Sequence, residues 1–174
     1  MPPKNEEILD AWKTTIEVQK HFNEMSLKIR QLAITSLGAF LAAYGYLFGQ
    51  SFENGHSVWD ALGSGASIII SILASIVWTA FYINDYHGYH RLLLGAVLHG
   101  NSIETQHGTE LPFIRLTKSI KEKSASKIFG ITLNSERRIR LFYILGYVIT
   151  LSPVWLSFGV FIVHTLASFC FVGK

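Results

Sequence analysis

The sequence predicts an all-α integral membrane protein with three transmembrane helices. Three uncharged, apolar stretches lead to this prediction: Leu32–Phe52, Ala61–Asn84 and Leu141–Gly173. Each exceeds the roughly 18 residues at which an apolar stretch becomes a candidate for a membrane-spanning helix. Charged residues make up only 16% of the chain, against about 25% in soluble domains. Because three such stretches are rare in one soluble domain, a buried soluble core is the disfavoured explanation.

The charges between these stretches predict the orientation of the chain. Region 52–60 carries Glu53 and Asp60 and no basic residue. Region 84–140 carries nine Lys or Arg residues and five acidic ones. Because lysine and arginine resist translocation, basic loops stay in the cytoplasm. We therefore expect the N-terminus and the basic region inside, and the outer loop 52–60 and the C-terminus outside.

The N-terminal region 1–31 is expected to form a cytoplasmic amphipathic helix, because its apolar residues recur at steps of three and four. No Pro or Gly interrupts the stretch from Glu6 to Gly38, so the helix is expected to continue into the first span, 32–51. Its apolar face must pack on the cytoplasmic loop, on another subunit or on the membrane, and packing on protein is favoured. The side chains proposed for oligomer or partner contact are Trp12, Ile16, Phe22 and Met25.

The second span is expected to occupy residues 61–83 and to continue beyond the membrane as a helix. Gly100 and the residue after it are expected to end this helix, because glycine is typical of helix ends. Residues 99–112 then form a polar loop. The whole of 84–140 is expected to be a basic cytoplasmic region.

Region 113–134 is ambiguous, since its first half suggests a helix and its second half is typical of either a helix or a short strand. Asn134 or Ser135 is suited to be the N-cap of the last helix. The third span is expected to occupy 141–172. Because proline removes a helical hydrogen bond, Pro153 is expected to kink it.

Small, weakly polar residues recur at every fourth position of the second span and form a stripe. Its members are Gly63, Ser67, Ser71, Ser75 and Thr79. Small residues let membrane helices approach closely, and hydroxyl groups hydrogen-bond across the contact, so helix packing is the favoured interpretation. The alternative is a polar path for ions between subunits. In the first span, Gly45 and Gly49 match the GxxxG pattern and are proposed as an oligomer contact.

Five cations crowd into the basic region and define a candidate ligand site. They are Arg115, Lys118, Lys121, Lys123 and Lys127. The simpler interpretation is contact with anionic lipid headgroups, and the alternative is a pocket for an anionic nucleotide or oligonucleotide. His87 and His90, which share a helix face, join the ligand-binding candidates. A metal at these histidines would lack a third and fourth ligand, so neither a metal nor a cofactor is expected.

The sequence carries no pattern that indicates catalysis. It has no nucleotide-binding glycine loop, nucleophile elbow or paired catalytic carboxylates, so we do not expect an enzyme. No charged residue lies deep in a predicted span, which argues against a pump with an intramembrane ion relay. A passive channel is compatible with this composition. Because three spans cannot enclose a pore alone, a channel requires a homo-oligomer.

The N-terminal helix resembles that of a known family. The segment Glu7–Met25, which includes Trp12 and Phe22, runs through Ile29 and Arg30 directly into an apolar span. In this tail and in its span layout, the chain resembles the transmembrane effectors of Hailong-type anti-phage systems, which are encoded beside nucleotidyltransferases. The resemblance implies a multi-pass, homo-oligomeric channel of the bacterial inner membrane, with a tetramer favoured. It also implies that an oligonucleotide made by the partner enzyme binds the cytoplasmic side and holds the channel shut.

Three functional hypotheses follow. The first is a homo-oligomeric, gated ion channel in antiviral defence, suited to anions by its basic inner side and controlled there by an anionic nucleotide or oligonucleotide. The second is a non-conducting membrane anchor or assembly subunit that recruits a soluble partner through its N-terminal helix. The third, and least favoured, is a metal-dependent membrane enzyme that uses His87 and His90.

Overall fold

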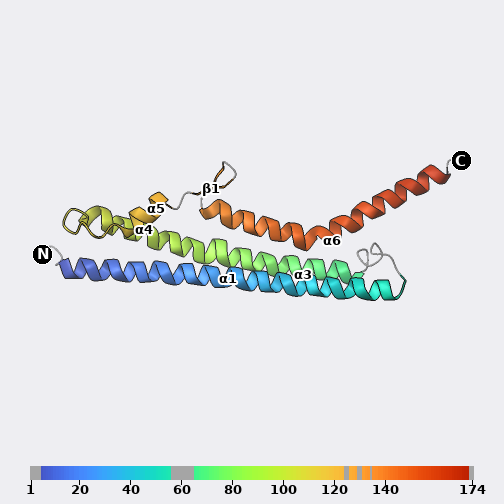
Figure 1. Ribbon diagram of the computed structural model, residues 1–174, viewed down its shortest axis with the longest axis horizontal. Helices are drawn as coiled ribbons and strands as arrows, with labels where there is room; N and C mark the ends of the chain where they lie inside the picture. The colour runs from blue at the N-terminus through green and yellow to red at the C-terminus, as the bar shows by residue number, and fades with distance from the viewer. Residues whose placement is uncertain (1–4, 56–64, 124–125, 129–130, 134, 173–174) are drawn as a thin grey trace. The chain divides into compact units, whose positions relative to one another are not determined.

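A computed structural model describes residues 5–55, 65–123, 126–128, 131–133 and 135–172 (Figure 1). The elements, in order, are α1 (Asn5–Glu53), α3 (Gly65–Tyr82), the π-helical segment η1 (Ile83–Tyr89), α4 (His90–His107), α5 (Leu116–Lys123), β1 (Ser126–Ile128), β2 (Ile131–Leu133) and α6 (Ser135–Val172). The predicted helical architecture is confirmed. Among the described residues, three helical stretches are long and apolar enough to cross a membrane: α1, the run Gly65–His107, and Ser135–Leu156 of α6.

The chain divides into two compact units. The first contains Met1–Gln31 and Phe81–Phe142, and the second contains Leu32–Ala80 and Tyr143–Lys174. Helices α1 and α6 contribute to both units, so the boundaries fall inside helices. Each unit is described separately below.

Helix α1 is one uninterrupted helix of 49 residues. The absence of Pro and Gly before Gly38 predicted that the amphipathic tail would continue into the first span, and α1 does so. Its end is marked by Gly55, whose φ of 72° suits glycine because it has no Cβ. The amide N–H of Gly55 donates to Phe52 O at 3.0 Å, which closes the last turn.

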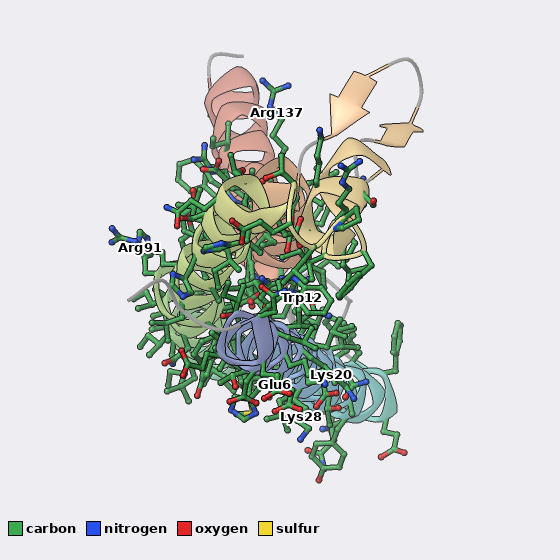
Figure 2. The ribbon with its side chains drawn as sticks, turned by 90° about the vertical axis from the view of Figure 1, so that its left-hand side faces the viewer. Glu6, Trp12, Lys20, Lys28, Arg91 and Arg137 are labelled. Carbon is green, nitrogen blue, oxygen red and sulfur yellow. The ribbon has the colours of Figure 1, made fainter. Side chains whose placement is uncertain are left out.

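The first unit has its core between α1 and the segment that follows α4. Ile8 of α1 is buried with Leu111 and Ile114, and Trp12 and Ile103 pack against this cluster. Figure 2 shows Trp12 pointing from α1 toward the other helices, whereas Glu6, Lys20 and Lys28 point away on the opposite side. The apolar face of the tail therefore packs on the segment that the sequence assigned to the cytoplasmic loop.

Helix α4 extends further than expected. Gly100 was predicted to end the helix and 99–112 to form a loop, but α4 continues to His107 and ends at Gly108. A Cβ on Gly100 would lie 2.6 Å from Gln19 Nε2 of α1. The prediction was wrong because this glycine permits a close helix contact, whereas the pattern alone suggested a helix end.

Region 113–134, for which the sequence left helix and strand open, contains both. It begins with the short helix α5 and continues with β1 and β2, which pair antiparallel with Ile128 opposite Ile131. Helix α6 begins at Ser135, one of the two expected N-cap positions, and Asn134 lies outside the described residues. Pro153 lies inside α6, and Figure 1 shows this helix bent partway along its length, in agreement with the expected kink.

The second unit packs α3 between the later part of α1 and the part of α6 that begins at Tyr143, through small or aromatic side chains. Ala33 of α1 and Ala74 of α3 are buried. Trp78 of α3 donates its indole N–H to Tyr143 O of α6 at 2.9 Å. The outer surfaces carry exposed aliphatic side chains such as Ile76 and Val148. The helices of this unit thus form hydrogen bonds with one another in the interior and expose aliphatic side chains on the outside, which suits contact with lipid.

Candidate functional site

A buried carboxylate in η1 forms the first polar centre of the chain. Asp85 is fully buried and accepts a hydrogen bond from the hydroxyl of Ser26. Arg30 Nε donates to Asp85 Oδ2 at 2.7 Å, and Arg30 Nη2 donates to Asp85 Oδ1 at 3.3 Å. The bidentate geometry makes this a strong charge-assisted pair. It fastens η1 to α1 directly before the first predicted span.

The next residue of η1 contacts the third long helix. The Tyr86 hydroxyl donates to Glu136 of α6 and accepts from Arg140 Nη2 at 2.7 Å. The Arg140 guanidinium also lies 5.4 Å from the centre of the Tyr86 ring, a cation–π distance. Asp85 thus faces α1, whereas Tyr86 faces α6. We call these contacts around Asp85 and Tyr86 the η1 junction.

Two predicted ligand residues, His87 and His90, belong to the η1 junction. The Tyr86 ring lies edge-on to His87 with centroids 5.0 Å apart and stacks on His90 with centroids 6.1 Å apart. The neighbouring Asp85 is paired with Ser26 and Arg30. Among the described residues, no group of three or more metal-ligating side chains is assembled.

A second carboxylate, Glu104 of α4, joins three elements. Its Oε1 accepts from the backbone N–H of Thr117 at 2.7 Å, and its Oε2 accepts from that of Lys118 at 3.0 Å. The indole N–H of Trp12 donates to Oε1 at 3.2 Å. Glu104 therefore caps the N-terminus of α5, where the helix dipole favours a negative charge, and holds α1 to the same point.

These contacts also set the acidity of Glu104. Burial by itself raises the pKa of the carboxyl group, but the hydrogen bonds from Thr117, Lys118 and Trp12 outweigh burial, so the pKa lies below its usual value. The side chain is therefore an anion at neutral pH. The link between α1, α4 and α5 depends on that charge.

A polar pocket of about 290 Å³ lies beside Glu104. Its lining residues are Asn101, Glu104, Thr105, Gly108, Thr109, Arg115 and Lys118. We call it the cation pocket, because two basic side chains stand in a wall of hydroxyl and amide groups, a combination that suits a phosphate group. Two of the predicted ligand residues, Arg115 and Lys118, are thus brought together.

The other predicted cations are placed only by their backbone. Lys121 and Lys123 lie on α5 and Lys127 lies on β1, and their side chains fall outside the described part of the structure. His87 and His90 lie in the η1 junction, whereas Arg115 and Lys118 line the cation pocket.

The stripe of α3 packs inside the second unit. Ser67 and Ser71 are buried, and the hydroxyls of Ser71 and Tyr44 of α1 hydrogen-bond to each other. Ser75 donates to Ser71 O at 2.8 Å. Thr79 donates to Ser75 O and lies 2.7 Å from the Tyr147 hydroxyl of α6.

The stripe therefore contacts helices of the same chain, as the packing interpretation requires. Gly63 lies outside the described residues. A pore-lining role for the stripe stays a prediction, because the structure contains one chain.

The residues proposed for oligomer contact divide into two groups. Trp12, Ile16, Phe22 and Met25 are half-buried, and Trp12 is already held by Glu104 of its own chain. Gly45 and Gly49 are exposed, and a Cβ at either position would meet nothing within 4 Å. The glycine face of α1 is thus open along the span, and its contact with another subunit stays a prediction.

Sequence reasoning missed the partners of both carboxylates. Arg30 directly precedes the first uncharged stretch, and Asp85 directly follows the second. Since these stretches were expected to run in opposite directions through the membrane, both residues belong at the same membrane face. That argument would have found the pair. No comparable signal marked Glu104, which looked like one charge in a polar loop.

Comparisons of the chain with protein-family models, curated proteins and solved structures found no match.

Proposed function

We propose that this protein is the subunit of a homo-oligomeric, gated ion channel in the bacterial inner membrane, controlled by an anionic nucleotide or oligonucleotide. The observation that carries the proposal is the position of Glu104. It lines the cation pocket with Arg115 and Lys118, and it also accepts a hydrogen bond from Trp12 of α1. Helix α1 then continues without interruption to Glu53, through the first predicted span.

Ligand binding is coupled to α1 through charge. A phosphate group held by Arg115 and Lys118 lies beside the Glu104 carboxylate and repels it, because like charges raise each other's free energy. Weaker capping of α5 by Glu104 loosens the contact with Trp12. The ligand thereby shifts the equilibrium between two arrangements of α1, in proportion to its difference in affinity for them.

The η1 junction is suited to transmit this shift. Asp85 contacts α1 and the next residue, Tyr86, contacts α6. Two consecutive residues of η1 therefore connect the helical run Gly65–His107 to both of the other long helices. π-Helical segments inside α-helices occur frequently at functional sites. A channel follows from the small number of spans, since only several copies together can enclose a pore. The role in antiviral defence is supported by the resemblance of the N-terminal helix to anti-phage effectors.

Ion flux from liposomes tests the proposal. The purified full-length protein is reconstituted with a trapped ion-sensitive dye, and flux is recorded with and without ATP or a short single-stranded oligonucleotide. Flux that responds to one of these anions supports the proposal, and the direction of the response shows whether the ligand opens or closes the channel. A stable oligomer that conducts in neither condition contradicts it.

Matched variants locate the ligand. The double substitution Arg115→Ala with Lys118→Ala removes the cations of the pocket and should abolish the response to ligand. Lys20→Ala with Lys28→Ala removes two exposed cations on the opposite face of α1 and should leave the response unchanged (Figure 2). Equal loss in both pairs would indicate a non-specific effect of charge.

The anchor hypothesis makes the opposite prediction. If the chain only recruits a soluble partner, Phe22→Ala should abolish capture of that partner and no variant should affect flux. The contacts of Ile8 and Trp12 inside the chain weigh against this alternative, because the apolar face of the tail is already in use.

A further inference from the structure

An apolar groove of about 350 Å³ runs along α4 in the first unit. Its apolar wall is aliphatic and comprises Leu93, Leu94, Val97 and Leu98 of α4 with Ile120 of α5. Leu94, Leu98 and Ile120 are 52%, 62% and 55% exposed. Open aliphatic surface of this kind marks a binding site for an apolar group.

The groove joins the cation pocket. Asn101 lines both cavities, and the adjacent residues Thr117 and Lys118 line one each. The combined site therefore has an aliphatic part and a part with Arg115 and Lys118. A ligand that satisfies both parts is an amphiphile with an apolar chain and an anionic head.

The length of the groove suits an extended acyl chain. Along α4 the lining extends from His90 to Asn101, which is about 16 Å at a rise of 1.5 Å per residue. The cation pocket adjoins the Asn101 end. An acyl chain in the groove would thus lie along α4 with its headgroup beside Arg115 and Lys118.

The walls favour an acyl chain over a nucleobase. Nucleobases are typically held by stacking on aromatic side chains or Arg planes. The apolar wall of the groove is built from Leu, Val and Ile. The one aromatic side chain in its lining, His90, already stacks on Tyr86. The charge at the head end comes from Arg115 and Lys118, whereas Glu104 is engaged by the N–H groups of α5.

We infer that α4 and α5 form a binding site for one anionic phospholipid, with an acyl chain in the apolar groove and the phosphate in the cation pocket. This inference goes beyond the proposed function, because the lipid needs no nucleotide. Since both ligands would use Arg115 and Lys118, the lipid and the nucleotide compete for the pocket.

Native mass spectrometry of the full-length protein in detergent tests the site. The protein is titrated with phosphatidylglycerol, with phosphatidylcholine of the same acyl chains, and with sn-glycerol 3-phosphate. We expect one phosphatidylglycerol per chain to be retained and phosphatidylcholine to bind about tenfold more weakly, because two cations attract the anionic headgroup. Equal retention of the two lipids, or equally tight binding of glycerol 3-phosphate, would overturn the inference.

Two matched pairs of variants separate this site from lipid bound elsewhere on the spans. Leu98→Gln should abolish retention, whereas Leu92→Gln, on the same helix and 52% exposed but outside the lining, should not. Arg115→Ala with Lys118→Ala should remove the preference for phosphatidylglycerol, whereas Arg91→Ala with Arg137→Ala should preserve it.

Unchanged retention in Leu98→Gln, with helix content intact by circular dichroism, would show that the lipid binds elsewhere. The measurement contains no nucleotide and records no flux. A failed lipid titration therefore leaves the channel proposal standing, and a failed flux assay leaves the lipid site standing.

Discussion

At the scale of single residues, Asp85 and Arg30 are the most consequential pair. A fully buried carboxylate is stable only when it is paired and hydrogen-bonded, and Asp85 has both Arg30 and Ser26. Either residue alone looks like an ordinary interfacial charge in the sequence. Their pairing depends on two helices that are far apart in the chain, which is why no local pattern revealed it.

Asp85→Asn should destabilise the protein by about 3 kcal/mol, because it leaves the Arg30 guanidinium without its counter-charge. Thermal unfolding in detergent measures the change. The control is Glu24→Gln, which breaks an exposed pair with Lys20 at 3.9 Å and should cost about 0.5 kcal/mol or less. Adding Arg30→Gln to Asp85→Asn should recover part of the loss, and a further equal loss would show that the two residues act independently.

Gly146 of α6 lies against the Trp78 ring in the second unit. A Cβ at this position would lie 1.8 Å from Trp78 Cζ2, so one of the two must move. Gly146→Ala should therefore lower the free energy of unfolding by about 3 kcal/mol through overpacking. Gly159→Ala on the same helix, where a Cβ meets nothing within 4 Å, is the control and should be neutral in the same melting experiment.

At the scale of elements, the contact of α5 with α4 and α1 depends on one carboxylate. The Glu104 pKa is lowered in the folded protein, so its ionised form contributes stability above the unfolded pKa, and that contribution is lost as the pH falls through the folded pKa. The sequence predicted a helix near Leu116, but it contained no sign of the residue that caps it.

Acidification should therefore release α5 before the protein unfolds globally. Hydrogen exchange at the amides of Thr117 and Lys118 should accelerate as the pH falls below the ordinary glutamate value of 4.5, after correction for the intrinsic exchange rate. In Glu104→Gln the exchange should be fast already at neutral pH and show no such transition. An unchanged transition in that variant would assign it to another group.

Helix boundaries show where local patterns were reliable. The continuity of α1 was predicted correctly, because the absence of Pro and Gly is a property of the segment itself. The end of α4 was not, because Gly100 is explained by its contact with Gln19 on another helix. The π-helical turns of η1, where Asp85 and Tyr86 contact α1 and α6, were not predicted from the sequence.

At the scale of the whole molecule, the three helices long and apolar enough to cross a membrane were predictable, and their partners were not. Apolar length is a local property, and it identified α1, the run Gly65–His107 and α6. The apolar groove and the cation pocket could be found only in the packed structure, because their walls come from several elements. The number of subunits depends on surfaces that one chain leaves open, of which the face with Gly45 and Gly49 is one.

Gly45→Leu should prevent or weaken assembly if this face is the contact between subunits, because a large side chain holds two helix backbones apart. Mass photometry of the purified protein measures the change in particle mass. Gly159→Leu fills another open position, on α6, and should leave the mass unchanged. Retention of the full mass in Gly45→Leu would exclude this face from the interface.

The uninterrupted α1 has a consequence for angular phase. Its buried residues Ile8, Thr15, Ser26, Ala33 and Tyr44 follow one another at intervals of seven and eleven residues. Seven-residue repeats favour left-handed supercoiling and eleven-residue repeats favour right-handed supercoiling. Because the two intervals alternate, their angular drifts cancel and the buried residues stay on one face of the helix. These five residues therefore share nearly the same angular phase on an ideal helix of 3.6 residues per turn.

One alanine inserted after Gln31 should break this phase, because each added residue turns the rest of a helix by about 100°. Seven inserted residues should nearly restore the phase, with a residual turn of about 20°. If control of flux passes along α1 as torsion, the short insertion should uncouple ligand from conductance and the longer one should recover the coupling. Equal behaviour of the two insertions would show that α1 acts only as a tether.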